Sequence, residues 1–373
     1  MIYLDNAATT PVRPEALQAA WPWLTSEFGN PSSQHELGFR AKDALADARA
    51  RVAKFFNAKS SEIIFTSGGT ESDNLGIVGL ALAKPRGKHI VSARTEHEAV
   101  LQSLDYLQRV HGFEITWLPL DEFGQVADLD IALRDDTTLV TLMVANNEIG
   151  TLHPIAELCA ATHARGALFH TDAVQAVGWI ELDVAKLEVD ALSISGHKFG
   201  APKGCGALFL KGRTAAEPLI HGGGQESGLR SGTENVAWAV ALATALELLP
   251  PMAAEAERVS NLRDEFIQSV LQAAPNAILT GHPTNRLPNI ASFCFADVSG
   301  EALLLELERR GVIVSSGSAC AAGSDEPSHV LTAIGIDAEL AQTAVRFSFS
   351  HDTSAEDLQH AVVALSSTLE GFK

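Results

Sequence analysis

Short apolar runs alternate with amphipathic stretches between about residue 60 and residue 210. The runs have the length of buried strands, and the stretches between them, such as 72–83 and 155–165, have the length and period of helices. This alternation predicts an α/β fold whose mostly parallel seven-stranded sheet is flanked by helices on both faces. The predicted strands are Glu62–Thr66, His89–Ala93, Glu114–Leu118, Leu139–Val144, Ala167–Thr171, Ala191–Ile194 and Ala207–Leu210.

The pattern changes after Pro250-Pro251, where a long charged helix begins. With 373 residues the chain exceeds the usual size of one hydrophobic core, so we expect two domains. The predicted limits are 13–252 for the large domain, and 1–12 with 253–373 for a smaller α+β domain. In the latter we expect helices at 253–273, 301–309 and from 354, and strands at 289–295, 312–314 and 343–348.

Composition excludes several classes of partner. The formal net charge of -19 and the pI of about 5.0 disfavour binding to nucleic acids or anionic membranes. The first six residues show neither a basic leader nor an apolar signal region, and the richest apolar run, 237–246, soon meets a glutamate and two prolines. We therefore expect a cytoplasmic protein with no membrane segment.

Four cysteines are present, and none form a C-x-x-C pair, so we expect neither a metal site nor a disulfide framework. Cys320 differs from Cys159, Cys205 and Cys294, which lie among apolar or helical neighbours typical of core positions. It lies within a run of small and turn-forming residues, about 315–330, that we expect to be a mobile loop. An accessible thiol there could serve as a nucleophile.

Lys198 and Asp172 carry the strongest chemical signal. Each follows a predicted strand, and the carboxyl ends of neighbouring parallel strands meet at one edge of a sheet. A lysine amine can form a Schiff base with pyridoxal 5'-phosphate (PLP), and a carboxylate can keep the pyridine nitrogen protonated. A solvated surface lysine would be the ordinary alternative if Lys198 stood alone.

A second signal is the turn Thr66-Ser67-Gly68-Gly69-Thr70-Glu71, which joins a strand to a helix. Its backbone N–H groups and hydroxyls could bind a phosphate, with Ser195 and His197 beside Lys198 completing the site. The alternative is an ordinary helix start capped by Ser67 or Thr70.

Three further residues are open to two interpretations. His97 could lie flat over a planar cofactor and relay protons, or be a solvated residue at a helix start. Asn147 could donate to a cofactor or substrate oxygen, or be a turn residue. Arg346, inside an apolar strand, could grip a substrate carboxylate or form a structural ion pair.

Taken together, these motifs resemble the cysteine desulfurases, class-V aminotransferases of PLP fold type I. The similarity covers essentially the whole chain. It also rests on the segments 3–11, 29–33, 221–226 and 230–235. The segment Ser316-Gly317-Ser318-Ala319-Cys320 resembles that of the long-loop group, NifS/IscS-like enzymes of iron–sulfur cluster assembly.

The resemblance implies a role for each matching residue. Catalysis would fall to Lys198, Cys320 and His97, and substrate binding to Arg346 and Asn147. Thr233 would reach the phosphate of a neighbouring subunit, which implies a homodimer with shared active sites. The implied PLP-binding residues are Gly69, Thr70, His97, Asn147, Asp172, Gln175, Ser195, His197, Lys198 and Thr233.

The implied reaction converts L-cysteine to L-alanine and leaves the sulfur as a persulfide on Cys320. A sulfur-acceptor protein such as an iron–sulfur scaffold would then receive it, for cluster assembly or tRNA thiolation. A selenocysteine lyase or a PLP aminotransferase of the same fold are the enzymatic alternatives. A non-enzymatic sulfur carrier would have no need of Lys198.

Overall fold

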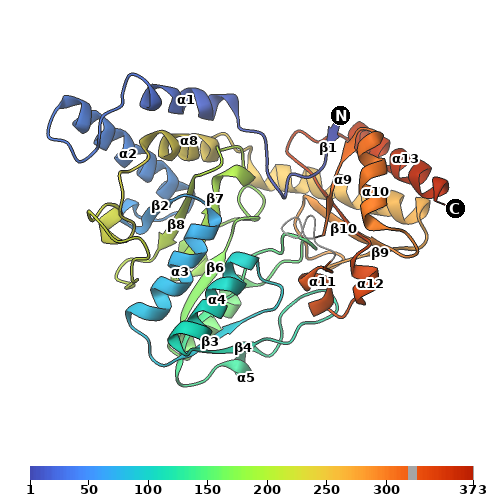
Figure 1. The fold of residues 1–373 in the computed structure, drawn as a ribbon, viewed down its shortest axis with the longest axis horizontal. Coiled ribbons are helices and arrows are strands. Elements are labelled where there is room, and N and C mark those ends of the chain that lie inside the picture. The colour runs from blue at the N-terminus through green and yellow to red at the C-terminus, as the bar shows by residue number, and fades with distance from the viewer. Residues whose placement is uncertain (318–325, 373) are drawn as a thin grey trace.

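The computed structural model describes residues 1–317 and 326–372. The larger of its sheets has seven strands, on the left in Figure 1, in the order β2-β8-β7-β6-β5-β3-β4. Only β8 runs antiparallel to its neighbours in this sheet, which confirms the mostly parallel topology. All seven predicted strands are present. Their bounds are β2 (Ile63–Thr66), β3 (His89–Ser92), β4 (Glu114–Trp117), β5 (Thr137–Thr141), β6 (Leu168–Asp172), β7 (Ala191–Ser195) and β8 (Gly206–Leu210).

Helices cover both faces of this sheet because successive strand residues point to opposite sides. Leu208 packs with the apolar residues of α3 and α4, whereas Ala207 and Phe209 pack with those of α1, α2 and α8. The helices of this part are α1 (Pro14–Leu24), α2 (Glu36–Phe55), α3 (Gly69–Ala83), α4 (Glu98–His111), α5 (Leu129–Ala132), α6 (Ile155–Ala164), α7 (Val184–Leu187) and α8 (Val236–Glu247). Three short 3-10 turns are η1 (Ser60–Glu62), η2 (Gly196–Lys198) and η3 (Glu226–Gly228).

A second, antiparallel sheet has the order β12-β13-β10-β9, and a separate parallel pair joins β1 to β11. These strands are β1 (Ile2–Tyr3), β9 (Ala277–Leu279), β10 (Ile290–Phe295), β11 (Val312–Ile313), β12 (Ser315–Ser316) and β13 (Ala344–Ser348). The accompanying helices are α9 (Met252–Ala273), α10 (Gly300–Arg309), α11 (His329–Ala333), α12 (Ala338–Ala341) and α13 (Ala355–Gly371). The predicted strands and helices of this region are therefore present, with β1, β9 and β12 in addition.

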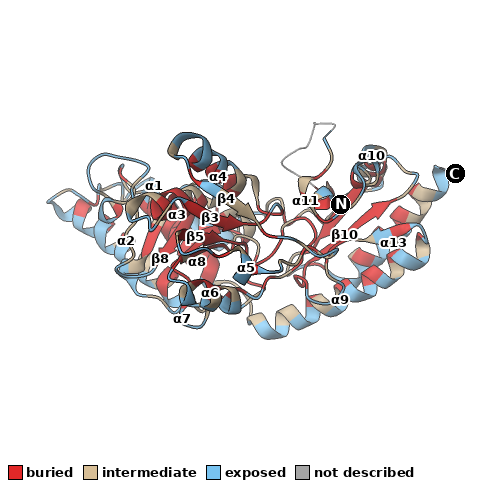
Figure 2. Cartoon of the chain, turned by 90° about the horizontal axis from the view of Figure 1, so that it is seen from below, coloured by how far each residue is buried: buried red, intermediate tan, exposed pale blue. Residues whose placement is uncertain are grey.

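Each sheet has its own core (Figure 2). In the smaller one Phe266 of α9 lies edge-on to Phe347 of β13, with ring centroids 5.0 Å apart. Aromatic pairs of this geometry add to the apolar area that they bury. The smaller sheet is thus a packed unit of its own beside the large one.

Residues 2–10 connect the two sheets. β1 pairs with β11, and the Asn6 backbone N–H donates to the Ser348 carbonyl of β13. Farther along, the Thr10 N–H donates to the carbonyl of His197, directly beside Lys198. This segment therefore lies at the carboxyl edge of the large sheet, where the polar motifs gather.

Among the described residues, no single helix combines the length and apolar character needed to cross a membrane. The bent pair formed by α8 and α9 passes that test jointly, by length and composition alone.

Candidate active site

Asp172 and Lys198 lie at the carboxyl ends of adjacent strands. Asp172 ends β6, and its partner in the parallel register is Ser193 of β7. Lys198 ends the 3-10 turn η2, which follows β7 directly. The positive charge of Lys198 acts on the pKa of Asp172, so the two groups share one electrostatic environment.

The Lys198 amine is held by the segment that joins the sheets. Its Nζ donates to the Ala7 carbonyl at 2.6 Å and to the Ala8 carbonyl at 2.9 Å. Gln175 donates from Nε2 to the same Ala7 carbonyl at 2.9 Å. Two carbonyl acceptors favour the protonated form of an amine. These hydrogen bonds therefore hold the Lys198 amine in a defined position near the carboxyl edge of the sheet.

The Asp172 carboxyl is buried. Burial raises its pKa, while the positive charges of His97 and Lys198 and a hydrogen bond from the Val174 N–H act in the opposite direction. A carboxylate with this surrounding can hold a proton on a heterocyclic nitrogen, because it pairs with the charge that such a proton creates.

The turn before α3 is shaped to admit an anion. Gly68 has φ of 153°, a conformation that favours glycine, and a Cβ on Gly69 would lie 2.9 Å from Cγ2 of Val174 and 3.3 Å from Cβ of Ser195. Among described side chains, none caps the N–H groups of this helix start, so the capping alternative for Ser67 or Thr70 is wrong. The buried Ser195 faces this turn, and Thr70 is exposed beside it.

His97 is the N-cap of α4, and its Nδ1 accepts the Ala99 N–H at 3.1 Å. In the neutral ring the proton is therefore on Nε2. The half-buried ring is close enough to Asp172 and Glu148 to affect the pKa of both.

His197 lies beside the same edge, where its Nδ1 is 3.1 Å from Oγ1 of Thr9. Burial, together with the charges of Lys198 and Lys203, lowers the pKa of His197 to about 4. The ring is thus neutral at physiological pH and able to donate one hydrogen bond.

Arg346 extends from β13 toward this edge from the smaller sheet. Nη1 donates to the Asn147 carbonyl at 2.9 Å, and Nη2 pairs with Oδ1 of Asp5 at 2.9 Å. The side chain is 1% exposed, and its Nε has no hydrogen-bond partner among the described residues. The structural ion pair expected as one alternative is therefore present, and Asn147 contributes its carbonyl to it.

Of the remaining predicted residues, one falls outside the described part of the chain and one lies apart from this group. Cys320 falls in 318–325, which lies outside the described residues. Thr233 is exposed in the segment between β8 and α8.

Two acidic contacts gave no recognisable sequence signal. Glu71 of α3 pairs with Arg230, with Nε 2.9 Å from Oε1, and also accepts the Ser67 N–H at 2.8 Å. The buried Glu148 accepts a hydrogen bond from Ser328 at 2.5 Å. The Glu71–Arg230 pair joins the Gly68–Gly69 turn to the segment between β8 and α8, which carries Thr233. No local pattern marks either pair, since their members are 159 and 180 residues apart.

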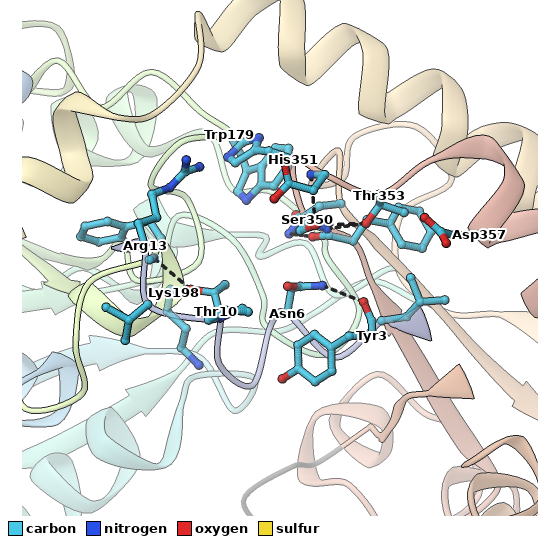
Figure 3. Close-up of a pocket in the computed structure, with 18 of the residues that line it drawn as sticks. Tyr3, Asn6, Thr10, Arg13, Trp179, Lys198, Ser350, His351, Thr353 and Asp357 are labelled. Carbon is cyan, nitrogen blue, oxygen red and sulfur yellow. Dashed lines mark hydrogen bonds between the residues drawn. The ribbon is translucent and has the colours of Figure 1, made fainter. Parts of the chain in front are cut away.

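A cavity of about 520 Å³ lies behind the segment 2–15, between the two sheets (Figure 3). Lys198 and Gln175 line it together with Arg13, Trp179 and His351, the last two stacked with centroids 4.1 Å apart. In Figure 3 the Lys198 amine points away from Trp179 and His351.

Comparison with known proteins gives the family. Residues 2–360 match the aminotransferase class-V family model. The chain belongs to the class-V aminotransferase family. It is 50% identical to a cysteine desulfurase IscS of Dictyoglomus turgidum, over 100% of this chain and 95% of that protein.

Solved structures agree. A NifS-like protein superposes with a TM-score of 0.92 at 34% identity, covering 99% of both chains. SspA in complex with cysteine superposes with a TM-score of 0.82 at 35% identity, covering 94% of this chain and 99% of that one. Within its family the chain thus groups with the NifS/IscS-like cysteine desulfurases, as the sequence motifs predict.

Enzymes of this family depend on PLP, so PLP is the cofactor of this chain. The residues present fit it. The Gly68–Gly69 turn is a cradle that a side chain at Gly69 would fill, which suits a phosphate at a helix start. Asp172 and Lys198 supply the carboxylate and amine that the ring nitrogen and the aldehyde require.

Proposed function

We propose that the protein is a PLP-dependent cysteine desulfurase. It converts L-cysteine to L-alanine and leaves the sulfur on Cys320 as a persulfide. The observation that carries the proposal is the meeting of Lys198 and Asp172 at one strand edge, beside a helix start open to a phosphate. The relatives named cysteine desulfurase give the reaction class.

Four sets of residues would each contact a different part of the coenzyme. Gly69 and Thr70, with Ser195 and His197, would bind its phosphate, and Asp172 would pair with its ring nitrogen. Gln175 and Asn147 would bond near its ring hydroxyl, and the His97 ring would lie against its plane. When bound, PLP supplies an electron sink that stabilises negative charge at the α-carbon of an amino acid.

Proton transfer would fall mainly to Lys198. His97 accepts the Ala99 N–H at Nδ1, so its neutral form presents a protonated Nε2 to the site and no basic lone pair. A free Lys198 amine can take the substrate α-proton, and the resulting ammonium has two acceptors waiting in the Ala7 and Ala8 carbonyls. His97 Nε2–H would then orient substrate by donating a hydrogen bond.

Sulfur transfer is balanced without any oxidant. The Cys320 thiolate attacks the substrate sulfur, an S–S bond forms, and the C–S bond of the substrate breaks. The electron pair of that bond returns to the substrate carbon, which takes up a proton to become alanine. The sum is cysteine plus a thiol giving alanine plus a persulfide.

Arg346 would bind the substrate carboxylate. It is buried, charged and already oriented by Asp5 and the Asn147 carbonyl, and its Nε has no partner among the described residues. A carboxylate arriving beside it would meet a donor that is costly to leave unpaired.

We further propose a homodimer in which Thr233 reaches the neighbouring phosphate site. Several large apolar side chains of α1, α2 and the segments next to them are exposed, as is common at interfaces between subunits. These are Leu17, Trp21, Leu24, Phe28, Phe39, Leu219 and Ile220. A sulfur-acceptor protein such as an iron–sulfur scaffold would dock later at the Cys320 segment.

The predicted division into a large domain of 13–252 and a small domain of 1–12 with 253–373 is part of the same proposal. It is supported by the core of the smaller sheet, which includes Leu4 and Ala7 and also contacts Ala145 and Trp179 of the large domain. We propose a cytoplasmic location, since a reducing compartment keeps the nucleophilic thiol and the buried Cys159, Cys205 and Cys294 reduced.

One experiment tests the function directly. Purified protein reconstituted with PLP is given L-cysteine, and alanine and protein-bound persulfide are measured with and without a keto acid. We expect both products without the keto acid. Alanine that appears only with a keto acid would indicate an aminotransferase instead. Lys198→Ala is the control, which should fail to bind PLP covalently and form neither product.

A further inference from the structure

A polar layer lies behind Asp172 on the face of the large sheet that α3 covers. His170 and Asp172 alternate on β6 and so point to the same face. Register pairing adds Thr141 of β5 opposite His170, and Ser193 of β7 opposite Asp172. From α3, Asp73 completes the group. Apolar residues of α3, α4 and the strands pack around this group on the same face.

Hydrogen bonds connect these side chains. Thr141 Oγ1 is 2.8 Å from His170 Nδ1, and Ser193 Oγ is 2.9 Å from His170 Nε2. Ser193 also bonds to the Asp73 carboxyl, whose Oδ1 is 3.7 Å from His170 Nε2. Helix α3 comes this close because residue 76 is glycine, where a Cβ would lie 2.6 Å from Cδ2 of His170.

In the part of the chain that the structure describes, no lysine or arginine forms an ion pair with Asp73. It is 1% exposed, and its Oδ1 has no hydrogen-bond partner among the residues that the structure describes. Of the described residues, only His170 lies close enough to Asp73 to form an ion pair with it if protonated, and both nitrogens of its ring already bond to hydroxyls. Burial lowers the pKa of His170 to about 3, so the ring is neutral.

Two carboxyls of this layer therefore differ in their surroundings. Burial raises the pKa of Asp172, but the charges of His97 and Lys198 and the hydrogen bond from the Val174 N–H favour its ionised form. For Asp73, burial and then the charge of Asp172 raise the pKa, and Glu96 adds to them, whereas only the hydrogen bond from Ser193 acts in the opposite direction. An isolated buried carboxylate is costly enough that such a group keeps its proton instead.

We propose that Asp73 is a positioning residue that holds a proton as an uncharged carboxylic acid. Of the two aspartates, Asp172 is then the ionised one, and the hydrogen-bonded Asp73–Ser193–His170 group fixes the position of the polar side chains behind it. This inference rests on the proposed function, because it assigns the layer a task at the PLP site.

The first test uses neutral replacements. Asp73→Asn keeps the shape and hydrogen bonding of an uncharged acid, whereas Asp73→Leu keeps only the size. We expect the dissociation constant of PLP, titrated into coenzyme-free protein, to stay within about threefold for Asp73→Asn. For Asp73→Leu it should rise by about tenfold or more, because the buried Ser193 hydroxyl loses one of its two hydrogen-bond partners and the polar layer behind Asp172 is interrupted. A tenfold weakening in Asp73→Asn would overturn the proposal, since it would mean that a charge is needed.

The second test detects the proton itself and needs no activity. Infrared spectra of coenzyme-free protein at neutral pH should show the carbonyl stretch of a protonated carboxyl that is lost in Asp73→Asn. Glu96→Gln is the matched control, because it removes the neighbouring buried carboxyl and should leave the Asp73 band in place. A wild-type spectrum without such a band at neutral pH would refute the assignment. A wild-type chain that takes up no PLP would refute the proposed function instead, and the infrared result would still decide the state of Asp73.

Discussion

Replacing Arg346 by methionine separates its role in the fold from the role in substrate binding that we propose for it. The guanidinium is buried, and Nη1 and Nη2 bond to the Asn147 carbonyl and to Asp5. Methionine fills a similar volume without charge. The substitution leaves the Asn147 carbonyl unpaired, which lowers the free energy of unfolding by about 1–3 kcal/mol, but it also removes the desolvation penalty of a buried cation. Since Asp5 is 19% exposed at its side chain, water can solvate it. We expect a modest net loss of stability.

The effect on catalysis should be much larger. A hydrogen bond to a charged group contributes roughly 1.5–3 kcal/mol, so losing two bonds to the substrate carboxylate corresponds to about 3–6 kcal/mol. At about 1.4 kcal/mol per factor of ten, kcat/KM for L-cysteine should fall by about two to four orders of magnitude. Steady-state alanine formation over a range of cysteine concentrations measures this value. PLP content, read from the absorbance of the bound coenzyme, should stay unchanged.

The matched control is Asp5→Asn, which removes the ion pair and keeps Arg346. It should lower stability while leaving kcat/KM for cysteine close to that of wild type, or raising it. A kcat/KM for Arg346→Met within about threefold of wild type at equal PLP content would refute the carboxylate-binding role. Equal losses of kcat/KM in Arg346→Met and Asp5→Asn would mean that Arg346 acts only through the stability of the fold.

Three other substitutions are informative. Cys320→Ser should keep PLP but lose persulfide formation, as thiol labelling of the protein after reaction with cysteine would show; wild-type sulfur transfer would disprove the assignment of the nucleophile. Gly69→Val should weaken PLP binding by about tenfold or more, because its Cβ would lie 2.9 Å from Val174 and fill the cradle, and an unchanged dissociation constant would contradict this site. Burial raises the pKa of Glu71, but hydrogen bonds from Arg230 and Ser67 outweigh burial and lower this pKa overall. The ionised Glu71 carboxylate therefore stabilises the fold at pH values above its unfolded pKa, and this contribution is lost as the pH falls through its folded pKa. Arg230→Met should therefore have a lower free energy of unfolding than wild type at neutral pH. Denaturant titrations should show this difference in free energy becoming smaller below about pH 4, and a difference that became larger at acid pH would contradict the prediction.

The hydrophobic pattern was sufficient to locate the large sheet. Strand β7 is a short buried run rich in apolar residues that is parallel to β6, and buried parallel strands need little else to be recognised. Two-residue strands such as β1 and β12 have no such period, because their pairing depends on partners far along the chain.

The site was predictable only in part, for a related reason. Lys198 and Asp172 could be found because each follows an apolar run, and the topology of parallel sheets fixes where such ends meet. The carbonyls of Ala7 and Ala8, which hold the lysine, have no residue type to reveal them. For Arg346 the sequence left a structural pair and a substrate contact equally open, and only the fold reveals Asp5 as its partner.

The connecting segment has a consequence for biosynthesis. Asp5 and Asn6 leave the ribosome long before Arg346 and Ser348, to which they bond. The Ala7 and Ala8 carbonyls that accept from the Lys198 amine therefore reach their final place only after β13 has been translated. A nascent chain could complete its large sheet and still lack these acceptors, which would delay sulfur chemistry until β13 is in place.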